Sequence, residues 1–168
     1  SFIFDIFLKL YRTTIKMESK SGDEENEEIT FNGIIYSINY DDKTASVTGP
    51  YYLSRDILIP RSITIESTEY IITSISKGSF DEKSSLISLN FPQDSQIRFI
   101  EEGAFYDSPI ESINIPASLI DLRKGWCENT SKLVNISVDQ NNPRYSSYEG
   151  KFIIGKSDDS SSVYDVLV

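Results

Sequence analysis

A short spacing of apolar residues recurs along the middle of the chain: an apolar residue, two other positions, a second apolar residue, one other position and a third. The full copies are Leu86, Leu89 and Phe91; Ile110, Ile113 and Ile115; and Leu133, Ile136 and Val138, while an earlier copy keeps Ile57 and Ile59. Proline follows three of these copies immediately, and its missing N–H and fixed φ stop a short strand. The pattern therefore predicts short strands that end at equivalent positions.

A second phrase follows the first three copies with identical internal spacing. It reads Ile72, Ile75, Gly78 and Phe80; then Ile97, Ile100, Gly103 and Phe105; then Leu119, Leu122, Gly125 and Cys127. From Leu86 to Ile110 is 24 residues and from Ile110 to Leu133 is 23, which is within the range of leucine-rich repeats. The spacing predicts a β-rich leucine-rich repeat solenoid with few or only short helical turns.

Stacking of the repeats gives this pattern its physical meaning. One repeat cannot bury its own apolar edge, so stacked coils must place equivalent residues in columns. We expect one shared core to hold Leu89, Phe91, Ile113, Ile115, Ile136 and Val138. Asn90, Asn114 and Ser137 should line up outside. The recurring glycine indicates a backbone position with φ > 0 or a close approach to the next coil.

Two hairpins are predicted before and within the first repeat. From Ile29 to Val47, β-branched and aromatic residues roughly alternate with polar ones around a polar break at 41–43, which is typical of a β-hairpin. Because a solenoid needs a polar-faced cap over its first coil, we assign residues 29–56 to a hairpin cap. The second hairpin spans 62–71, where the first repeat carries an insertion.

The remaining boundaries follow from these assignments. We expect residues 1–28, with their acidic run, to be a disordered or non-native segment. Residues 57–155 should form the solenoid of about four coils. Residues 156–168 should form a loop and strand that continue into a further repeat, so that the chain is a fragment whose open C-terminal end frays or self-associates.

Composition and charge exclude several functions. The net charge of −10 disfavours nucleic acid or an anionic membrane as a partner. No stretch of the chain is long and apolar enough to insert into a bilayer. The absence of histidine removes Ser/His/Asp and Cys/His catalysis and every His-containing metal site. We therefore expect no catalytic, metal or cofactor site.

Two remaining reactive groups receive structural interpretations. Cys127 is the single cysteine and stands at the position of Phe80 and Phe105, so it is predicted to be a small buried apolar residue rather than a reactive thiol. Paired carboxylates from Asp107, Glu111, Asp121 and Glu128 are the one enzymatic alternative. They are scattered over coil surfaces without a pocket signature, which favours a non-enzymatic protein.

A repetitive face of outward residues is the predicted binding site. The outward residues are Leu58, Asn90, Asn114 and Ser137 on the first strand of the repeats, and Thr73, Ser74, Arg98, Phe99, Ile120 and Asp121 on the second. The partner-binding candidates among them are Leu58, Asn90, Phe99, Asn114, Ile120 and Ser137. The apolar members Leu58, Phe99 and Ile120 could form one contact patch for a protein partner. The alternative is an intracellular scaffold or structural protein, which the missing signal peptide and the unpaired cysteine support.

The sequence resembles the BspA-like leucine-rich repeat surface proteins, whose repeats are of the Treponema type. The phrases IPRSI, SISKGSF, FIEEGAF, SINIPASL and KGWCENTSKLVNISV carry the resemblance, which covers residues 29–168. It implies a β-rich solenoid, display on the cell surface, and an adhesin or antigen that binds host proteins, such as extracellular matrix, or proteins of neighbouring cells. It implies no catalytic residues. The sequons at Asn129 and Asn135 would accept glycans only in a secreted chain.

Overall fold

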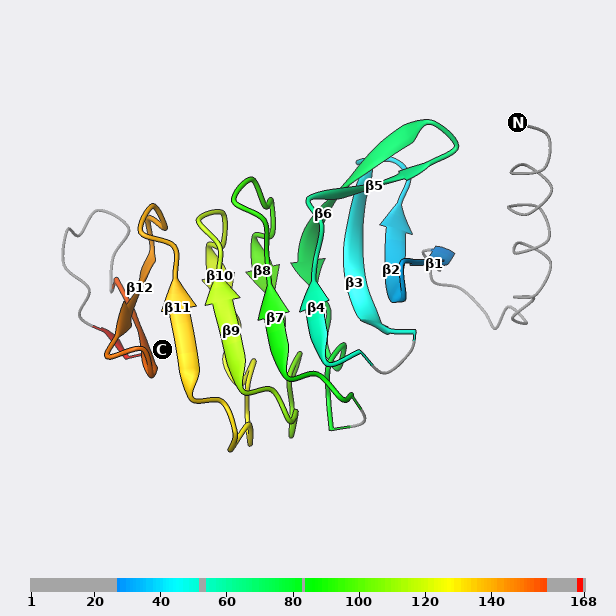
Figure 1. Ribbon diagram of the computed structural model, residues 1–168. Helices are drawn as coiled ribbons and strands as arrows, with labels where there is room; N and C mark the ends of the chain where they lie inside the picture. The colour runs from blue at the N-terminus through cyan, green and yellow to red at the C-terminus, as the bar shows by residue number, and fades with distance from the viewer. Residues whose placement is uncertain (1–26, 52–53, 83, 157–165, 168) are drawn as a thin grey trace.

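The chain folds as a stack of β-coils (Figure 1). A computed structural model describes residues 27–51, 54–82, 84–156 and 166–167, and every regular element in these ranges is a strand. Successive coils follow one another along a single axis, from β1 at one end to a small terminal sheet at the other. The predicted leucine-rich repeat solenoid is confirmed. The expectations for residues 1–26 lie outside the described residues.

Two main sheets form the walls of the stack. Sheet A has the order β1 (Glu27–Phe31), β2 (Ile34–Asn39), β3 (Thr44–Pro50), β6 (Thr68–Ile75), β8 (Phe99–Ile100) and β10 (Asp121–Leu122), with β5 (Ser62–Ile65) beside β6. Sheet B is wholly parallel and consists of β4 (Asp56–Leu58), β7 (Ser88–Asn90), β9 (Ser112–Ile115) and β11 (Asn135–Val138). Sheet C contains β12 (Tyr145–Tyr148), β13 (Phe152–Gly155) and β14 (Val166–Leu167).

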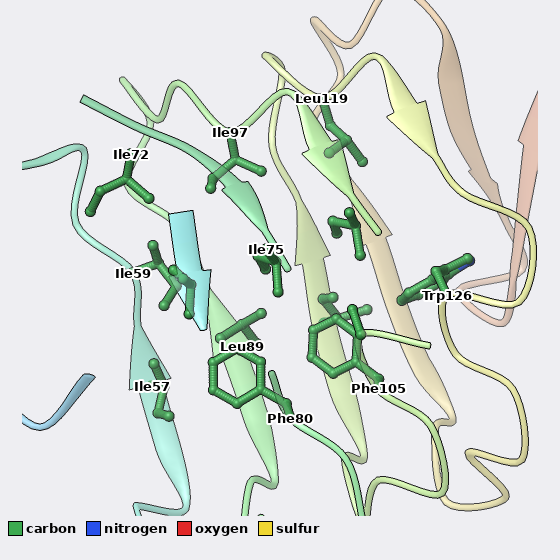
Figure 2. Packing of buried hydrophobic residues seen from close by; sticks show 14 of the residues in the cluster. Ile57, Ile59, Ile72, Ile75, Phe80, Leu89, Ile97, Phe105, Leu119 and Trp126 are labelled. Carbon is green, nitrogen blue, oxygen red and sulfur yellow. The ribbon is translucent and has the colours of Figure 1, made fainter. Parts of the chain in front are cut away.

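The apolar columns lie between sheets A and B (Figure 2). Ile57, Leu89 and Ile113 are in register across β4, β7 and β9, and Ile136 follows on β11. Sheet A supplies Ile75 and Ile100 in register. All these side chains belong to one buried cluster, against which Phe91 and Val138 pack partly buried. The predicted shared core is thus confirmed.

The recurring glycine lies at a tight turn after β6, β8 and β10 of sheet A. Gly78, Gly103 and Gly125 have φ of 70, 64 and 74°, the left-handed region that favours glycine. The N–H of Gly78 donates to the carbonyl of Gly103 at 3.2 Å, and that of Gly103 donates to Gly125 at 3.1 Å. The turns therefore stack through their backbones, and a side chain at these positions would be strained.

An aromatic column follows these turns, and it corrects the prediction for Cys127. The rings of Phe80 and Phe105 stack with centroids 5.5 Å apart, and Trp126 meets Phe105 edge-on at 5.8 Å. Trp126 is 5% exposed, whereas Cys127 is only half-buried. The large indole, one position before the expected residue, fills the volume beside Phe105. Cys127 is therefore not the apolar filler of this column.

Antiparallel hairpins precede the first coil, as the fold prediction required. β2 and β3 pair around the turn at 40–43, and β1 adds a third strand that begins at Glu27, two residues before the expected cap. β3 then pairs parallel with β6, so the cap continues sheet A. The β5–β6 hairpin projects from the stack, and its Tyr70 ring packs edge-on against Tyr40 at 5.7 Å. The exact division of the chain into 1–28, 29–56, 57–155 and 156–168 stays a prediction.

The β12–β13 hairpin docks on the last coil through two polar side chains. Asn142 is buried, and its amide donates to the carbonyls of Pro116 at 2.8 Å and Leu119 at 3.0 Å. Its oxygen accepts from the N–H groups of Arg144 and Tyr145. The Tyr145 hydroxyl in turn accepts from the N–H of Leu122 at 3.1 Å. Among the described residues at this end, the Tyr145 side chain thus bonds to the backbone of the edge strand β10. Residues 163–165 and 168 lie outside the description.

Replacing Phe105 by alanine should destabilise the fold by about 3–5 kcal/mol, because the change removes a fully buried ring between two aromatic neighbours and leaves a cavity. The matched change Asn114→Ala, on the outer face of sheet B, should cost less than about 1 kcal/mol. Urea titration of both variants measures the difference. Equal shifts of the unfolding midpoint would show that the inward and outward positions have been assigned wrongly.

Replacing Asn142 by alanine should cost about 2–5 kcal/mol, since four backbone groups lose a buried hydrogen-bond partner. Asn141→Ala is the control, because Asn141 is exposed and its amide donates to the nearby Asp139 and not to the preceding coil among the described residues. Thermal unfolding followed by circular dichroism would separate the two. If both variants melt together with the parent protein, Asn142 does not hold the terminal hairpin.

Candidate functional site

The outer surface of sheet B carries two rows of side chains, all of them polar except Leu58. We call them together the ladder face: Asp56, Ser88, Ser112 and Asn135 in one row, and Leu58, Asn90, Asn114 and Ser137 in the other. Alternation along each strand puts these residues outside because their neighbours are buried. Hydrogen bonds run between strands, from Ser88 to Asp56 at 2.6 Å and from Asn114 to Ser137 at 3.1 Å. The predicted alignment of Asn90, Asn114 and Ser137 outside the core is confirmed.

A shallow groove of about 300 Å³ runs along this face over β7, β9 and β11. Its lining residues are Asn90, Ser112, Ile113, Asn114, Asn135, Ile136, Ser137 and Gly150. Gly150 belongs to the β12–β13 turn, and its carbonyl accepts from the N–H of Ile136 at 2.8 Å. Sheet C therefore forms one wall of the groove. Sequence spacing finds the asparagine row, but nothing in the sequence brings residue 150 beside β11.

The outer surface of sheet A carries a different set of side chains. We call it the sheet A patch: Thr73, Ser74, Arg98, Phe99, Ile120 and Asp121, with Glu101 and Arg123 at its edge. Ser74, Phe99 and Asp121 are in register across β6, β8 and β10. The Arg98 guanidinium lies over the Phe99 ring, 5.7 Å from its centroid. The patch thus presents a half-buried aromatic ring flanked by an exposed cation.

Ion pairs surround this ring on one side. The Arg123 guanidinium lies 3.2 Å from Asp121 and 3.8 Å from Glu101, and all three side chains are at least one third exposed. Because such pairs are screened by water, they hold the side chains in place more than they stabilise the fold. Arg98 was predicted to project outward beside Phe99, whereas Arg123 was not among the predicted binding residues.

The structure separates the six predicted partner-binding residues into two groups. Leu58, Asn90, Asn114 and Ser137 lie on the ladder face, whereas Phe99 and Ile120 lie on the sheet A patch. Sheets A and B enclose the core between them, so their outer faces point in opposite directions. Leu58 is 60% exposed but lies on β4, at the edge of sheet B. The expected single patch of Leu58, Phe99 and Ile120 is therefore wrong.

The candidate carboxylates have different surroundings. Asp121 pairs with Arg123, while Asp107, Glu111 and Glu128 are exposed. Asp107 is linked to Glu128 through its backbone N–H, which donates to the Glu128 carbonyl at 3.0 Å. Within the described ranges, no three Cys, Asp or Glu side chains gather where they could hold a metal ion. In the same ranges no helix has the length and apolar character to cross a bilayer.

Burial affects two ionisable groups. Loss of solvent raises the pKa of the Cys127 thiol, so little thiolate forms at neutral pH and the residue is a poor nucleophile. Burial likewise raises the pKa of Tyr36 and keeps its phenol neutral. Both groups take part in the packing of the solenoid, and neither lies in the groove or on the sheet A patch.

Solved structures with a similar arrangement are bacterial leucine-rich repeat proteins. One from Bacteroides capillosus is 18% identical, with a TM-score of 0.42 over 67% of this chain and 98% of that one. The pneumococcal vaccine antigen PcpA is 15% identical, with a TM-score of 0.46 over 80% and 55%. A leucine-rich cell surface protein from Faecalibacterium prausnitzii is 12% identical, with a TM-score of 0.32 over 78% and 59%. The chain thus spans nearly all of the first protein and little more than half of the other two.

The repeat itself assigns the family. No curated protein matches the chain. The family described as the BspA type leucine-rich repeat region, six copies long, matches residues 59–149, which is more than half of the 168 residues. This range begins at Ile59 at the end of the first sheet B strand and ends in the β12–β13 turn, so it includes the stacked coils with their glycine turns and aromatic column. The chain belongs to the BspA-type leucine-rich repeat family.

Proposed function

We propose that the chain is a non-enzymatic protein-binding module that is displayed on a cell surface and contacts its partner through the sheet A patch. The observation that carries this proposal is the Phe99 ring beneath Arg98 on the outer side of sheet A. Aromatic residues and arginine contribute most to protein interfaces, because a rigid ring and a planar guanidinium bury much area at small entropic cost. Membership of the BspA-type family supports surface display and an adhesin or antigen role.

The surroundings of the ring favour a specific protein contact. Ser46 and Ser74 continue the row toward β3 and share a hydrogen bond of 2.7 Å, so the surface beside Phe99 is polar. Asp121 and Arg123 form a charged border on the other side. An apolar centre with a polar and charged rim is the arrangement of transient protein interfaces, in which the rim sets orientation and the centre supplies affinity.

The proposed partner is a protein whose contact surface is neutral or basic, because the chain itself is acidic. With a net charge of −10, the chain would be steered toward basic surfaces and repelled by acidic ones. Extracellular matrix and host cell-surface proteins are the proposed class. The alternative location, inside the cell as a scaffold, is tested separately by treating intact cells that express the tagged full-length parent with protease. Digestion of the tag would place it at the surface, and protection would favour the scaffold.

Substituting Phe99 and Ile120 by serine should reduce binding to immobilised extracellular-matrix proteins by at least about tenfold, a loss of about 1.4 kcal/mol. The matched control is Tyr106→Ser, which removes an aromatic side chain that is 43% exposed on a turn outside the patch. Surface plasmon resonance measures all three proteins. Melting temperatures within a few degrees of the parent would show that folding is intact. Undiminished binding by the Phe99→Ser, Ile120→Ser protein would overturn the assignment of the patch.

A further inference from the structure

The groove on the ladder face has a chemistry unlike that of the sheet A patch. None of its eight lining residues is charged, although a quarter of the chain is. Its lining side chains are amides and hydroxyls, apart from Ile113 and Ile136, which point into the core from the strands of its floor. An ionic ligand would find no counter-charge here and would lose hydration without compensation. The groove is therefore suited to a neutral, polar ligand.

The hydrogen-bonding capacity of the groove is only partly used within the protein. Asn114 donates to Ser137, but the side chains of Asn90, Ser112 and Asn135 make no hydrogen bond within the described part of the chain. Each amide offers two donor hydrogens and an acceptor oxygen, and each hydroxyl offers both functions. Hydroxyl-rich ligands have the same mixed character. The groove can thus exchange hydrogen bonds in both directions with neighbouring hydroxyl groups.

The polar side chains that line the groove also repeat from strand to strand. Asn90 and Asn114 occupy equivalent positions on neighbouring parallel strands, which lie roughly 4.8 Å apart. These two amides and the Ser137 hydroxyl on the next strand are therefore presented at regular intervals across the sheet. A linear polymer with hydroxyl groups on each unit can engage successive strands, whereas a single small polar molecule would engage only one interval.

Two exposed aromatic side chains lie on sheet C, on either side of the turn that contributes Gly150 to the groove. Tyr148 and Phe152 pair across β12 and β13, are 54% and 45% exposed, and flank the turn that contains the groove residue Gly150. The face of an aromatic ring is electron-rich, and it attracts the weakly positive C–H bonds on one side of a sugar ring. Aromatic side chains beside neutral amides and hydroxyls form a surface suited to a sugar.

A protein strand fits this groove less well. Its floor is the face of sheet B, in which β7 and β9 pair with strands on both sides, and at the edge strand β11 the N–H of Ile136 donates to the carbonyl of Gly150. A peptide strand lying on this face would not extend the sheet through backbone hydrogen bonds. Apolar anchors are also absent from the lining side chains that face outward. A protein interface needs such anchors at its centre. The ladder face and the sheet A patch are thus suited to different classes of ligand.

We propose that the groove over β7, β9 and β11 binds a linear neutral glycan. Asn90, Asn114 and Asn135 exchange hydrogen bonds with its hydroxyl groups, and Tyr148 and Phe152 contact a sugar ring at the sheet C end. This function is separate from the proposed protein contact, because the two sites lie on opposite faces. A cell-surface protein with both sites would hold a glycan and a protein at the same time.

The test is a titration of the full chain, labelled with ¹⁵N, against cellohexaose and chitohexaose, with an anionic hyaluronan hexasaccharide and an uncharged Ser/Asn-rich hexapeptide as comparisons. We expect a neutral glycan to shift the amide signals of Asn90, Ser112, Asn135 and Gly150 in a saturable way, while Phe99 and Asp121 stay unshifted. Saturable binding that favours hyaluronan or the peptide would overturn the proposal. So would the absence of saturation by both neutral glycans at millimolar concentration.

Variants then locate the site. Asn90→Ala and Asn135→Ala together should weaken glycan binding at least tenfold, and Phe152→Ala should weaken it several-fold. Asn141→Ala, an exposed asparagine outside the groove, is the matched control and should bind as the parent does. The Phe99→Ser, Ile120→Ser protein should keep full glycan binding, so that failure of the protein-binding proposal and failure of this one are distinguished. Equal affinity of the Asn90→Ala, Asn135→Ala protein and the parent would overturn the assignment.

Discussion

Contact between apolar columns on sheets A and B is the interaction on which the rest of the structure depends. The first three coils each contribute one strand to sheet A and one to sheet B, and neither strand has enough neighbours to be stable alone. Burial of Leu89 and Ile113 against Ile75 and Ile100 is complete or nearly so, which fixes the register of each coil on the next. A slip by one residue would turn these side chains to solvent and bring polar ones inside. The core thus dictates the order of the outer rows.

The two outer faces are consequences of that register, but their chemistry is free to differ. On sheet B the outward positions hold small residues that bond along the rows, as Asn114 does with Ser137. On sheet A the outward positions, which the core does not constrain, hold Phe99 beside Arg98 and Asp121 beside Arg123. Since neither set is needed to bury the core, both are available for binding. The same stack therefore carries a neutral groove on one side and an aromatic, charged patch on the other.

The repeat could be predicted from the sequence because equivalent residues of successive coils contact one another. Such residues recur at a regular spacing along the chain. Spacing alone identified the inward residues, the glycine turns and the hairpin before the first coil. The pair Asn32-Gly33, with φ of 48 and 78°, is also a strong hairpin signal that would have predicted the turn between β1 and β2. Local signals of this kind depend on neighbouring residues and need no knowledge of the fold.

Contacts between non-equivalent positions could not be predicted in this way. The spacing predicted that Cys127 would occupy the position equivalent to Phe105 in the next coil. The larger Trp126 side chain fills the volume beside Phe105 instead. In the sequence Asn142 is typical of an exposed turn. In the structure it is buried because its amide donates hydrogen bonds to the carbonyls of Pro116 and Leu119 in the preceding coil. Phe99 and Leu58 both read as outward residues, yet only the fold shows that they lie on different sheets.

The most direct test of the two-faced solenoid is a set of nuclear Overhauser contacts in the isotope-labelled chain. We expect contacts between side-chain protons of Asn114 and Ser137 and between Ser74 and the Phe99 ring, because each pair lies on neighbouring strands of one sheet. We expect none from the Phe99 ring to Asn114, which lies across the core on the opposite face. A contact between Phe99 and Asn114 would place the two rows on one side and would contradict the two-faced solenoid.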